Sequence, residues 1–181
     1  MGAEEEPVVA LIRRGALEEA ATLCVREHAH AIGRLSMAML GNQAEAEEAV
    51  QETFLSAHRA IGQFRGESRV RAWLFTIARR ICARRLALRV RDGKRLLLAR
   101  ETISDVASPL ELADEARRAR SVRAALAKLK PSEREILLLR YQSGLSFREV
   151  VEVSGLRPAA ARKRTSRALA RLRTLLKHEV E

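Results

Sequence analysis

Acidic side chains are the first residues of this sequence whose types and spacing could do chemistry. Glu47, Glu48 and Glu52 lie within six positions, and paired carboxylates can act as a general acid and base or hold a metal ion. No histidine, nucleophile or phosphate-binding glycine loop accompanies them, so the sequence indicates neither an enzyme nor a metal or other cofactor. A surface that docks on a basic partner, or a solvated helix face, is the better interpretation.

Basic side chains gather in two separate blocks. Residues 59–91 hold ten arginines and one acid, a net charge of +9, and residues 157–177 hold eight basic residues and no acid. Residues 1–58 hold four arginines and ten glutamates, a net of −6, while the chain of 181 residues carries +11. Two basic blocks predict two contacts with a polyanion, either nucleic acid or an anionic membrane.

The rest of the composition favours an all-α protein of two small domains. Apolar residues make up 47% and aromatic residues 3%, so the cores must rest on Leu, Ile, Val and Ala. No apolar run is long enough to span a membrane, and the start "MGAEEEPVV" lacks the basic and apolar parts of a signal peptide. We therefore expect a cytoplasmic protein that does not insert into a membrane by itself.

The two cysteines, Cys24 and Cys82, are far apart and form no CxxC pair. His28 lies four residues after Cys24, but two ligands fall short of the four that a zinc site usually needs. A disulfide is not expected in a reducing compartment, so both thiols are interpreted as buried structural cysteines.

The elements that must position these charges are helices. Helical patterning runs from Val8 to Leu40, and Asn42 then restarts the chain as an N-cap, with Glu45 as its capping-box partner. One apolar stripe follows at spacings of three and four, made by Ala46, Val50, Phe54, Ala57 and Ile61. The acidic residues and Gln51 lie off this stripe, which predicts a free, solvated acidic surface.

Glycines bracket the loop "GQFRGES", and an arginine-rich helix follows it. That helix opens at Glu67 or Ser68, and its buried stripe is Val70, Leu74, Ile77 and Ile81. Aromatic residues beside such a loop suit unpaired bases. For Trp73, packing in the core is favoured over stacking on a base. For Phe64, the two interpretations are equally favoured. Arg84 falls near the apolar side, so either it reaches outward along its stem or the helix bends.

A second helical unit follows a linker from Asp92 to about Glu115. Ser132 with Glu135, and Ser146 with Glu149, have the spacing of capping boxes. Gly155 ends a short helix, and Pro158 begins a longer basic one with the stripe Ala161, Thr165, Ala168, Leu172 and Leu176. This pattern predicts a helix-turn-helix whose second helix enters the major groove. The alternative is an ordinary helical hairpin with a solvated basic face.

Two stretches resemble one family in the right order. "EAEEAVQETFLSAHRAIGQFRGESRVRAWLFTIARR" resembles the second conserved region of the bacterial extracytoplasmic-function (group IV) RNA polymerase sigma factors. "LAKLKPSEREILLLRYQSGLSFREVVEVSGLRPAAARKRTSRALARLR" is similar to their fourth region. The resemblance implies a region 2 domain at 8–92, a flexible linker at 93–118 and a region 4 helix-turn-helix domain at 119–178.

The resemblance also implies partners and site residues for an alternative sigma factor. The partners are core RNA polymerase, promoter DNA and an anti-sigma factor. Residues implied to bind core polymerase are Glu47, Glu48, Gln51, Glu52 and Phe54. Residues implied to recognise and open the minus-ten element are Gln63, Phe64, Arg65, Glu67, Ser68, Arg79, Arg80 and Arg84. Residues implied to read the minus-thirty-five element are Arg157, Ala160, Arg162, Lys163, Arg164 and Arg167.

The sequence departs from the family pattern at two places. Glu48-Ala49 stands where Asp-Leu is common in the family. Glu48 keeps the carboxylate, but Ala49 offers a smaller apolar contact than leucine. "AARK", from Ala160 to Lys163, replaces a run of Thr-Val-Lys-Ser, so readout at Ala160 would use a thymine methyl or DNA shape. The competing readings are a helix-turn-helix regulator that acts without core polymerase and an enzyme acting on nucleic acid.

Overall fold

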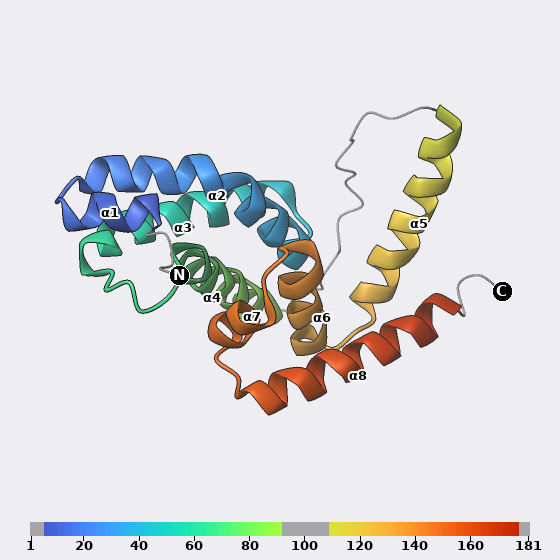
Figure 1. The fold of residues 1–181 in the computed structure, drawn as a ribbon. Coiled ribbons are helices and arrows are strands. Elements are labelled where there is room, and N and C mark those ends of the chain that lie inside the picture. Colours follow the sequence, from blue (N-terminus) through green and yellow to red (C-terminus); the bar gives the residue numbers. More distant parts are fainter. Residues whose placement is uncertain (1–5, 92–108, 178–181) are drawn as a thin grey trace.

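The computed structural model describes residues 6–91 and 109–177, and every regular element in these ranges is a helix (Figure 1). The all-α prediction is therefore confirmed. None of the helices in these ranges combines the length and apolar character that a membrane crossing requires.

The amino-terminal region starts with two helices where the sequence pattern suggested one. Gly15 separates them with a φ of 76°, a left-handed conformation that glycine adopts without steric cost. Asn42 caps the third helix, and its side chain accepts a hydrogen bond of 2.9 Å from the backbone N–H of Glu45. The elements are α1 Pro7–Arg13, α2 Leu17–Leu40, α3 Gln43–Ala60, the 3-10 turn η1 Ile61–Gln63 and α4 Val70–Arg91.

The carboxy-terminal region begins with a helix inside the segment predicted as a linker. Helix α5 starts at Pro109, and the remainder of that segment, up to residue 108, lies outside the described residues. The elements are α5 Pro109–Ala127, α6 Pro131–Leu137, the π-helical turn η2 Leu138–Gln142, α7 Phe147–Ser154 and α8 Pro158–Lys177.

The predicted cap of α6 is wrong by two residues. Pro131 is the first helical residue, a position that suits its fixed φ and missing N–H, so Lys130 is the N-cap. The carboxylate of Glu133 accepts a hydrogen bond of 3.3 Å from the backbone N–H of Lys130. Glu135, predicted as the box partner of Ser132, is thereby left to contact another helix.

The helix-turn-helix forms as predicted. Ser146 Oγ accepts from the backbone N–H of Glu149 at 3.2 Å, and the Glu149 carboxylate accepts from the backbone N–H of Ser146 at 2.7 Å. Gly155 ends α7 with a φ of 67°, and Pro158 begins α8. Helix α8 runs beneath α6 in this view (Figure 1).

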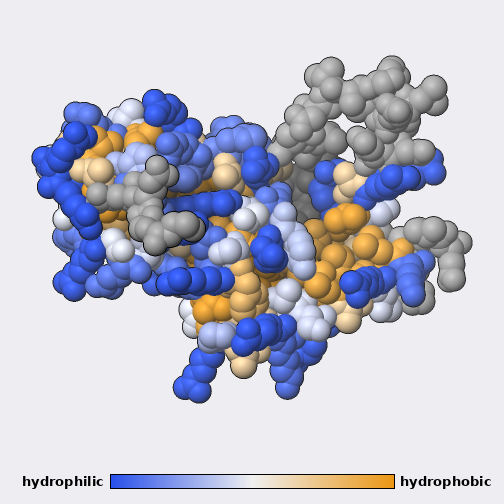
Figure 2. Space-filling view, viewed as in Figure 1, coloured by the Kyte–Doolittle hydropathy of each residue, from blue (hydrophilic) through white to orange (hydrophobic). Residues whose placement is uncertain are grey.

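One continuous hydrophobic cluster holds both regions together. Phe75 and Leu74 of α4, Leu35 of α2, and Leu139 and Val150 of the carboxy-terminal region are all fully buried in it. Figure 2 shows hydrophilic side chains over much of the surface, with an apolar area where α5, α6 and α8 meet.

The two cysteines are buried and free, as predicted. Burial, with smaller contributions from Glu27 and Glu6, raises the pKa of the Cys24 thiol to about 11. A thiol with this pKa stays protonated at neutral pH and is a poor nucleophile or ligand.

Candidate nucleic-acid and partner-binding surfaces

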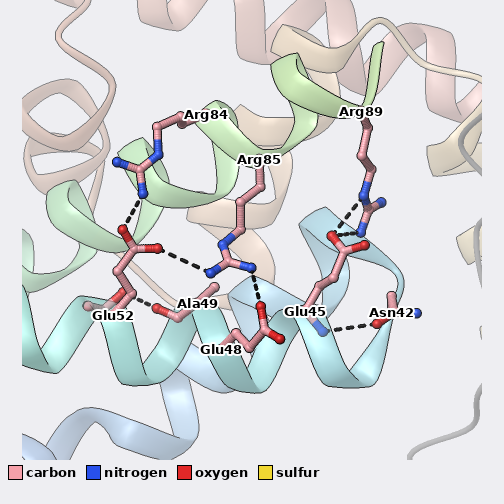
Figure 3. A network of polar contacts seen from close by, with 9 residues as sticks. Asn42, Glu45, Glu48, Ala49, Glu52, Arg84, Arg85 and Arg89 are labelled. Atoms are coloured by element: carbon pink, nitrogen blue, oxygen red, sulfur yellow. Dashed lines mark hydrogen bonds and ion pairs between the residues drawn. The ribbon is translucent and has the colours of Figure 1, made fainter. Parts of the chain in front are cut away.

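An arginine ladder joins α4 to α3 (Figure 3). Arg84 pairs with Glu52, and Arg85 bridges Glu48 at 2.8 Å and Glu52 at 3.2 Å. One turn further on, Arg89 pairs with Glu45 and donates to the Leu40 carbonyl at 2.7 Å. We call these six residues the arginine ladder, namely Glu45, Glu48, Glu52, Arg84, Arg85 and Arg89.

The ladder follows from helical spacing on both sides. Positions 45, 48 and 52 recur at three and four residues, so their carboxylates share one face of α3. Arg85 and Arg89 are four apart on the facing side of α4. The predicted free acidic surface is therefore wrong for Glu52, which is paired and only 32% exposed, whereas Glu48 is paired with Arg85 but keeps a solvated side chain that is 63% exposed. The question left open for Arg84 is also answered: its side chain is 61% exposed and reaches outward to α3.

The ladder shifts the ionisation of Glu52. Partial burial acts to raise the pKa of this carboxyl, but the hydrogen bonds and charges of Arg84 and Arg85 outweigh it and hold the pKa below the ordinary 4.5. A carboxyl with a depressed pKa stabilises the fold above its unfolded pKa, and that stabilisation is lost as pH falls through the folded pKa. Glu149 behaves likewise, because the Ser146 hydrogen bonds and the charges of Arg71 and Arg69 outweigh the effect of burial on its pKa.

Breaking the ladder will destabilise the protein. Glu52→Gln keeps the size of the side chain but removes the charge that faces Arg84 and Arg85, so we expect a loss of about 1 kcal/mol in unfolding free energy at pH 7. Glu47→Gln on the same helix serves as the control. Urea unfolding of both variants should show the difference at pH 7 and a smaller one at a pH below the folded pKa of Glu52, where the wild-type carboxyl itself becomes protonated. An equal loss at both pH values would contradict an ionic role.

An apolar groove of about 480 Å³ lies between α2 and α3. Val25 and Leu55 line it with exposed side chains, the latter 59% exposed, and the half-buried Phe54 and exposed Gln51 lie beside them. Glu47, one turn before Gln51, is exposed and accepts a hydrogen bond of 2.6 Å from Gln43. Of the five residues implied to bind core polymerase, Glu47, Gln51 and Phe54 thus remain available beside an apolar groove.

In the loop between α3 and α4, the aromatic ring of Phe64 packs against the ring of Trp73. The Phe64 and Trp73 ring centroids lie 5.0 Å apart at an interplanar angle of 47°, and both rings are half-buried. Arg65 and Glu67 are exposed on either side of Gly66, which has a φ of 71°. Trp73 therefore packs against the core, as the sequence favoured, and its ring also supports the ring of Phe64. Gln63 and Ser68 complete the loop, the first exposed and the second half-buried.

The arginines of α4 divide into engaged and exposed side chains. Arg79 pairs with Glu135 of α6, and the exposed fractions of the two side chains are 25% and 18%. Arg84 belongs to the ladder. Arg80 is exposed, and the structure gives it no hydrogen bond or ion pair within the described ranges. The eight residues implied to act at the minus-ten element are thus not one continuous surface in this structure.

Helix α8 presents its basic residues to solvent. Arg157, Lys163 and Arg167 are exposed, and Arg164 is half-buried. The Arg162 guanidinium lies 5.5 Å from the centroid of the Phe147 ring, a cation–π contact that fixes its direction. Ala160 is exposed on the first turn of α8, where the residues of a recognition helix reach base edges.

Sequence reasoning missed several contacting residues. The exposed Leu55 lies off the apolar stripe of α3, and an apolar residue at a predicted solvent position is a signal that could have marked the groove. Arg71 and Arg134 also went unassigned, although each contacts the opposite region of the chain. No local pattern marks such contacts, because their partners are backbone carbonyls far away in the sequence.

Comparisons with known proteins identify the family of this chain. The family Sigma-70 region 2 matches residues 24–92, and Sigma-70, region 4 matches residues 119–172. The RNA polymerase sigma factor CarQ of Myxococcus xanthus is 35% identical over 149 residues, covering 82% of this chain and 84% of CarQ. The ECF sigma factor SigC of Mycobacterium tuberculosis is 34% identical over 138 residues, covering 73% and 70%. This chain belongs to the extracytoplasmic-function (group IV) sigma factors.

Solved sigma-factor structures share the fold. CnrH, in its complex with the cytosolic domain of CnrY, matches with a TM-score of 0.70 and 27% identity, covering 94% of this sigma factor and 96% of CnrH. RpoE of Bartonella quintana, in complex with the anti-sigma factor NepR, matches with a TM-score of 0.70 and 26% identity, covering 86% and 96%. This ECF sigma factor therefore works with RNA polymerase as an alternative sigma factor. A regulator acting without the polymerase is not favoured, because region 2 accompanies the helix-turn-helix.

Proposed function

We propose that this sigma factor binds core RNA polymerase, directs it to specific promoters and helps to melt the minus-ten element. Domains at 8–92 and 119–178 divide this work between promoter melting and upstream recognition. The observation that carries the proposal is the exposed Phe64 loop, seated on Trp73 at the start of a basic helix. Runoff transcription with core polymerase, followed by sequencing of the transcripts, tests it. Initiation at the same sites without this protein would contradict it.

Promoter melting is assigned to the loop and to the exposed arginines behind it. A half-buried ring supported by a second aromatic is a platform on which an unpaired base can stack. Gln63, Arg65, Glu67, Ser68 and Arg80 surround the platform or follow it on α4. Arg79 and Arg84 are paired with Glu135 and Glu52. They can contact DNA only after these ion pairs break, so we propose that they join the site after the loop has bound.

Upstream recognition is assigned to α8. Five cationic side chains lie within the eleven residues 157–167, which contain no acid, namely Arg157, Arg162, Lys163, Arg164 and Arg167. Such residues neutralise phosphates and fix the register of the helix on the duplex. Exposed Ala160 is suited to an apolar contact with a thymine methyl group.

Docking on core polymerase is assigned to the groove between α2 and α3. The groove offers apolar Leu55, Val25 and Phe54, flanked by the polar Gln51 and the acidic Glu47. This surface fits a helical partner with an apolar ridge and basic flanks. Glu48 and Glu52 are assigned to holding α3 against α4 rather than to direct contact.

Charge reversal outside the ladder tests this docking surface. We expect Glu47→Lys combined with Gln51→Lys to weaken binding to core polymerase about fivefold, because basic side chains would then face a basic partner. Reversal of Glu48 and Glu52 would not serve, since it would also break the ladder. Fluorescence anisotropy with labelled protein measures the affinity, and Glu19→Lys, on an exposed position of α2, is the control. Unchanged affinity in the double variant would exclude this groove as the docking surface.

Three further assignments complete the proposal. RpoE of Bartonella quintana was solved with an anti-sigma factor, and we infer that a partner of this class binds and holds the present protein. The protein acts by binding rather than by catalysing a reaction. It works in the cytoplasm, where polymerase and promoter DNA are found.

A further inference from the structure

Helix α4 begins with a backbone N–H group that bonds to a side chain far away in the sequence. The first N–H groups of a helix have no partner within it, and Val70, the first residue of α4, is only 1% exposed. An unpaired N–H at a buried residue would destabilise the fold, because it has lost its hydrogen bonds to water. The Glu6 carboxylate accepts from this N–H at 3.0 Å, from a position 64 residues earlier. Glu6 therefore caps a helix to which it does not belong.

The charge of Glu6 suits this position. The amino-terminal end of a helix carries partial positive charge, which an anion stabilises and a cation does not. The first turn of α4 contains no acidic residue, while Arg69 and Arg71 flank Val70. Both arginines line the same cleft as Glu6. Glu6 thus supplies the negative charge that the sequence around the start of α4 lacks.

Glu6 is itself held in place by helix α1. Its backbone carbonyl accepts a hydrogen bond of 2.8 Å from the N–H of Val9, and Pro7 opens the helix. Val8 is 2% exposed and anchors α1 in the hydrophobic cluster. Because the backbone of Glu6 is already ordered, its bond to α4 costs less conformational entropy than one from a free chain end.

Helix α1 also contacts the loop that precedes α4. We call residues 64–69, between η1 and α4, the minus-ten loop. A Cβ atom at Gly66 would lie 3.9 Å from Val9 Cγ1, which is van der Waals distance, so the backbone of this loop passes beside α1. The amino-terminal segment therefore touches the loop at Gly66 and holds its end at Val70.

The first turn of α4 supports the aromatic pair of the minus-ten loop. The Trp73 N–H donates to the Arg69 carbonyl at 3.0 Å and so closes this turn. The Phe64 ring packs on Trp73 with the centroids 5.0 Å apart. Fraying of the turn would displace Trp73 and with it the support of Phe64. A cap at Val70 therefore acts on Phe64 through Trp73.

We propose that Glu6 is a positioning residue for the minus-ten loop, because its carboxylate fixes the first turn of α4 and thereby holds Phe64 on Trp73 before a base arrives. Such preorganisation favours binding, since less of the site has to be ordered when the ligand binds. The inference rests on the proposed function for what Phe64 binds. The positioning itself is measured on the free protein.

Amide hydrogen exchange of the full chain tests the positioning without DNA. Glu6→Ala should speed exchange of the Val70 N–H about tenfold, the effect of losing a hydrogen bond to a charged group. Glu6→Gln keeps an acceptor but not the charge, and because a neutral bond is about half as strong, exchange should rise only about threefold. Glu19→Ala, at an exposed position of α2, is the control. Unchanged exchange at Val70 in Glu6→Ala would overturn the proposal.

Fluorescence reports the aromatic pair directly, because Trp73 is the only tryptophan of the sequence. Acrylamide should quench Trp73 more strongly in Glu6→Ala than in Glu6→Gln or the control, since a frayed first turn exposes the ring. Exchange at the buried residues Leu35 of α2 and Ala57 of α3 should stay at the wild-type rate. If these core amides exchange faster to the same extent as Val70, Glu6 stabilises the whole fold and the positioning role is wrong.

Promoter melting separates this inference from the proposed function. Open-complex formation on a duplex promoter should fall about threefold in Glu6→Ala and less in Glu6→Gln, because apparent affinity falls with the fraction of molecules whose loop is in place. Phe64→Ala is measured beside them. A loss in Phe64→Ala without a loss in Glu6→Ala would show that the loop works without the cap and would overturn the inference. No loss in either variant, with faster exchange in Glu6→Ala, would leave the positioning role intact and exclude the minus-ten assignment.

Discussion

Replacing Phe64 and Arg65 together by alanine will reduce open-complex formation on duplex promoters about 30-fold, a loss within the range of one stacked base and one phosphate contact. The same variant should lose much less on a template whose minus-ten region is already unpaired. Permanganate footprinting measures melting on the duplex, and runoff transcription measures initiation on both templates.

The reason lies in where the two side chains sit. The Phe64 ring is held at 5.0 Å from Trp73, so a base that leaves the duplex meets a surface that is already in place. In the proposed complex, Arg65, which is exposed next to Gly66, adds a cation beside the backbone of the displaced strand. Stacking on a preformed surface compensates for the base pairing that melting breaks, which is why a template without that pairing depends on it less.

Two controls decide the interpretation. Arg59→Ala removes an exposed arginine from the end of α3, outside the loop, and should leave melting unchanged. Trp73→Leu keeps an apolar side chain beneath Phe64 but removes the aromatic support, so it should show an intermediate loss. If the double variant loses equally on duplex and unpaired templates, the loop captures a base without helping to melt the promoter.

Local features of the fold could be predicted because their causes lie within a few residues. Asn42 and Ser146 cap helices through backbone N–H groups three residues away, and Gly155 and Pro158 set the turn between α7 and α8. The failure at Ser132 has the same local origin, since the preceding proline fixes the helix start two residues earlier than a Ser132 cap allows.

The long-range contacts could not be predicted from the same patterns. Glu52 looked free because helical spacing shows which residues share a face but not which helix will cover that face. Its partners are 32 and 33 residues further along the chain. Arg79 and Glu135 are 56 residues apart, and each has an ordinary local interpretation as a solvated or capping residue. Sequence therefore predicted which residues carry charge, and only the packing of helices determined which charges are occupied.

The recognition helix carries the last prediction, which distinguishes phosphate contacts from base readout. Arg167→Ala should weaken binding to all promoter sequences about eightfold at 0.1 M salt and lower the salt slope by about one unit, the value of one released counterion. Arg167 is exposed, and its Nε lies 3.4 Å from the Lys163 carbonyl, so the side chain follows the surface of its own helix. A phosphate contact fixes position without distinguishing bases.

Ala160→Thr should behave differently in the same promoter library. The alanine methyl can meet a thymine methyl but donates no hydrogen bond, so changing that base should cost the wild type about 1 kcal/mol, at the low end of a bidentate contact. A threonine hydroxyl adds a donor and an acceptor on the exposed first turn of α8, and this should re-rank sequences at one upstream position. Lys163→Ala should give a result between those of the other two variants, because the Lys163 ammonium group can contact either a phosphate or a guanine. If Arg167→Ala re-ranks bases, or no variant alters use of the upstream element, then α8 lies in the groove in another orientation.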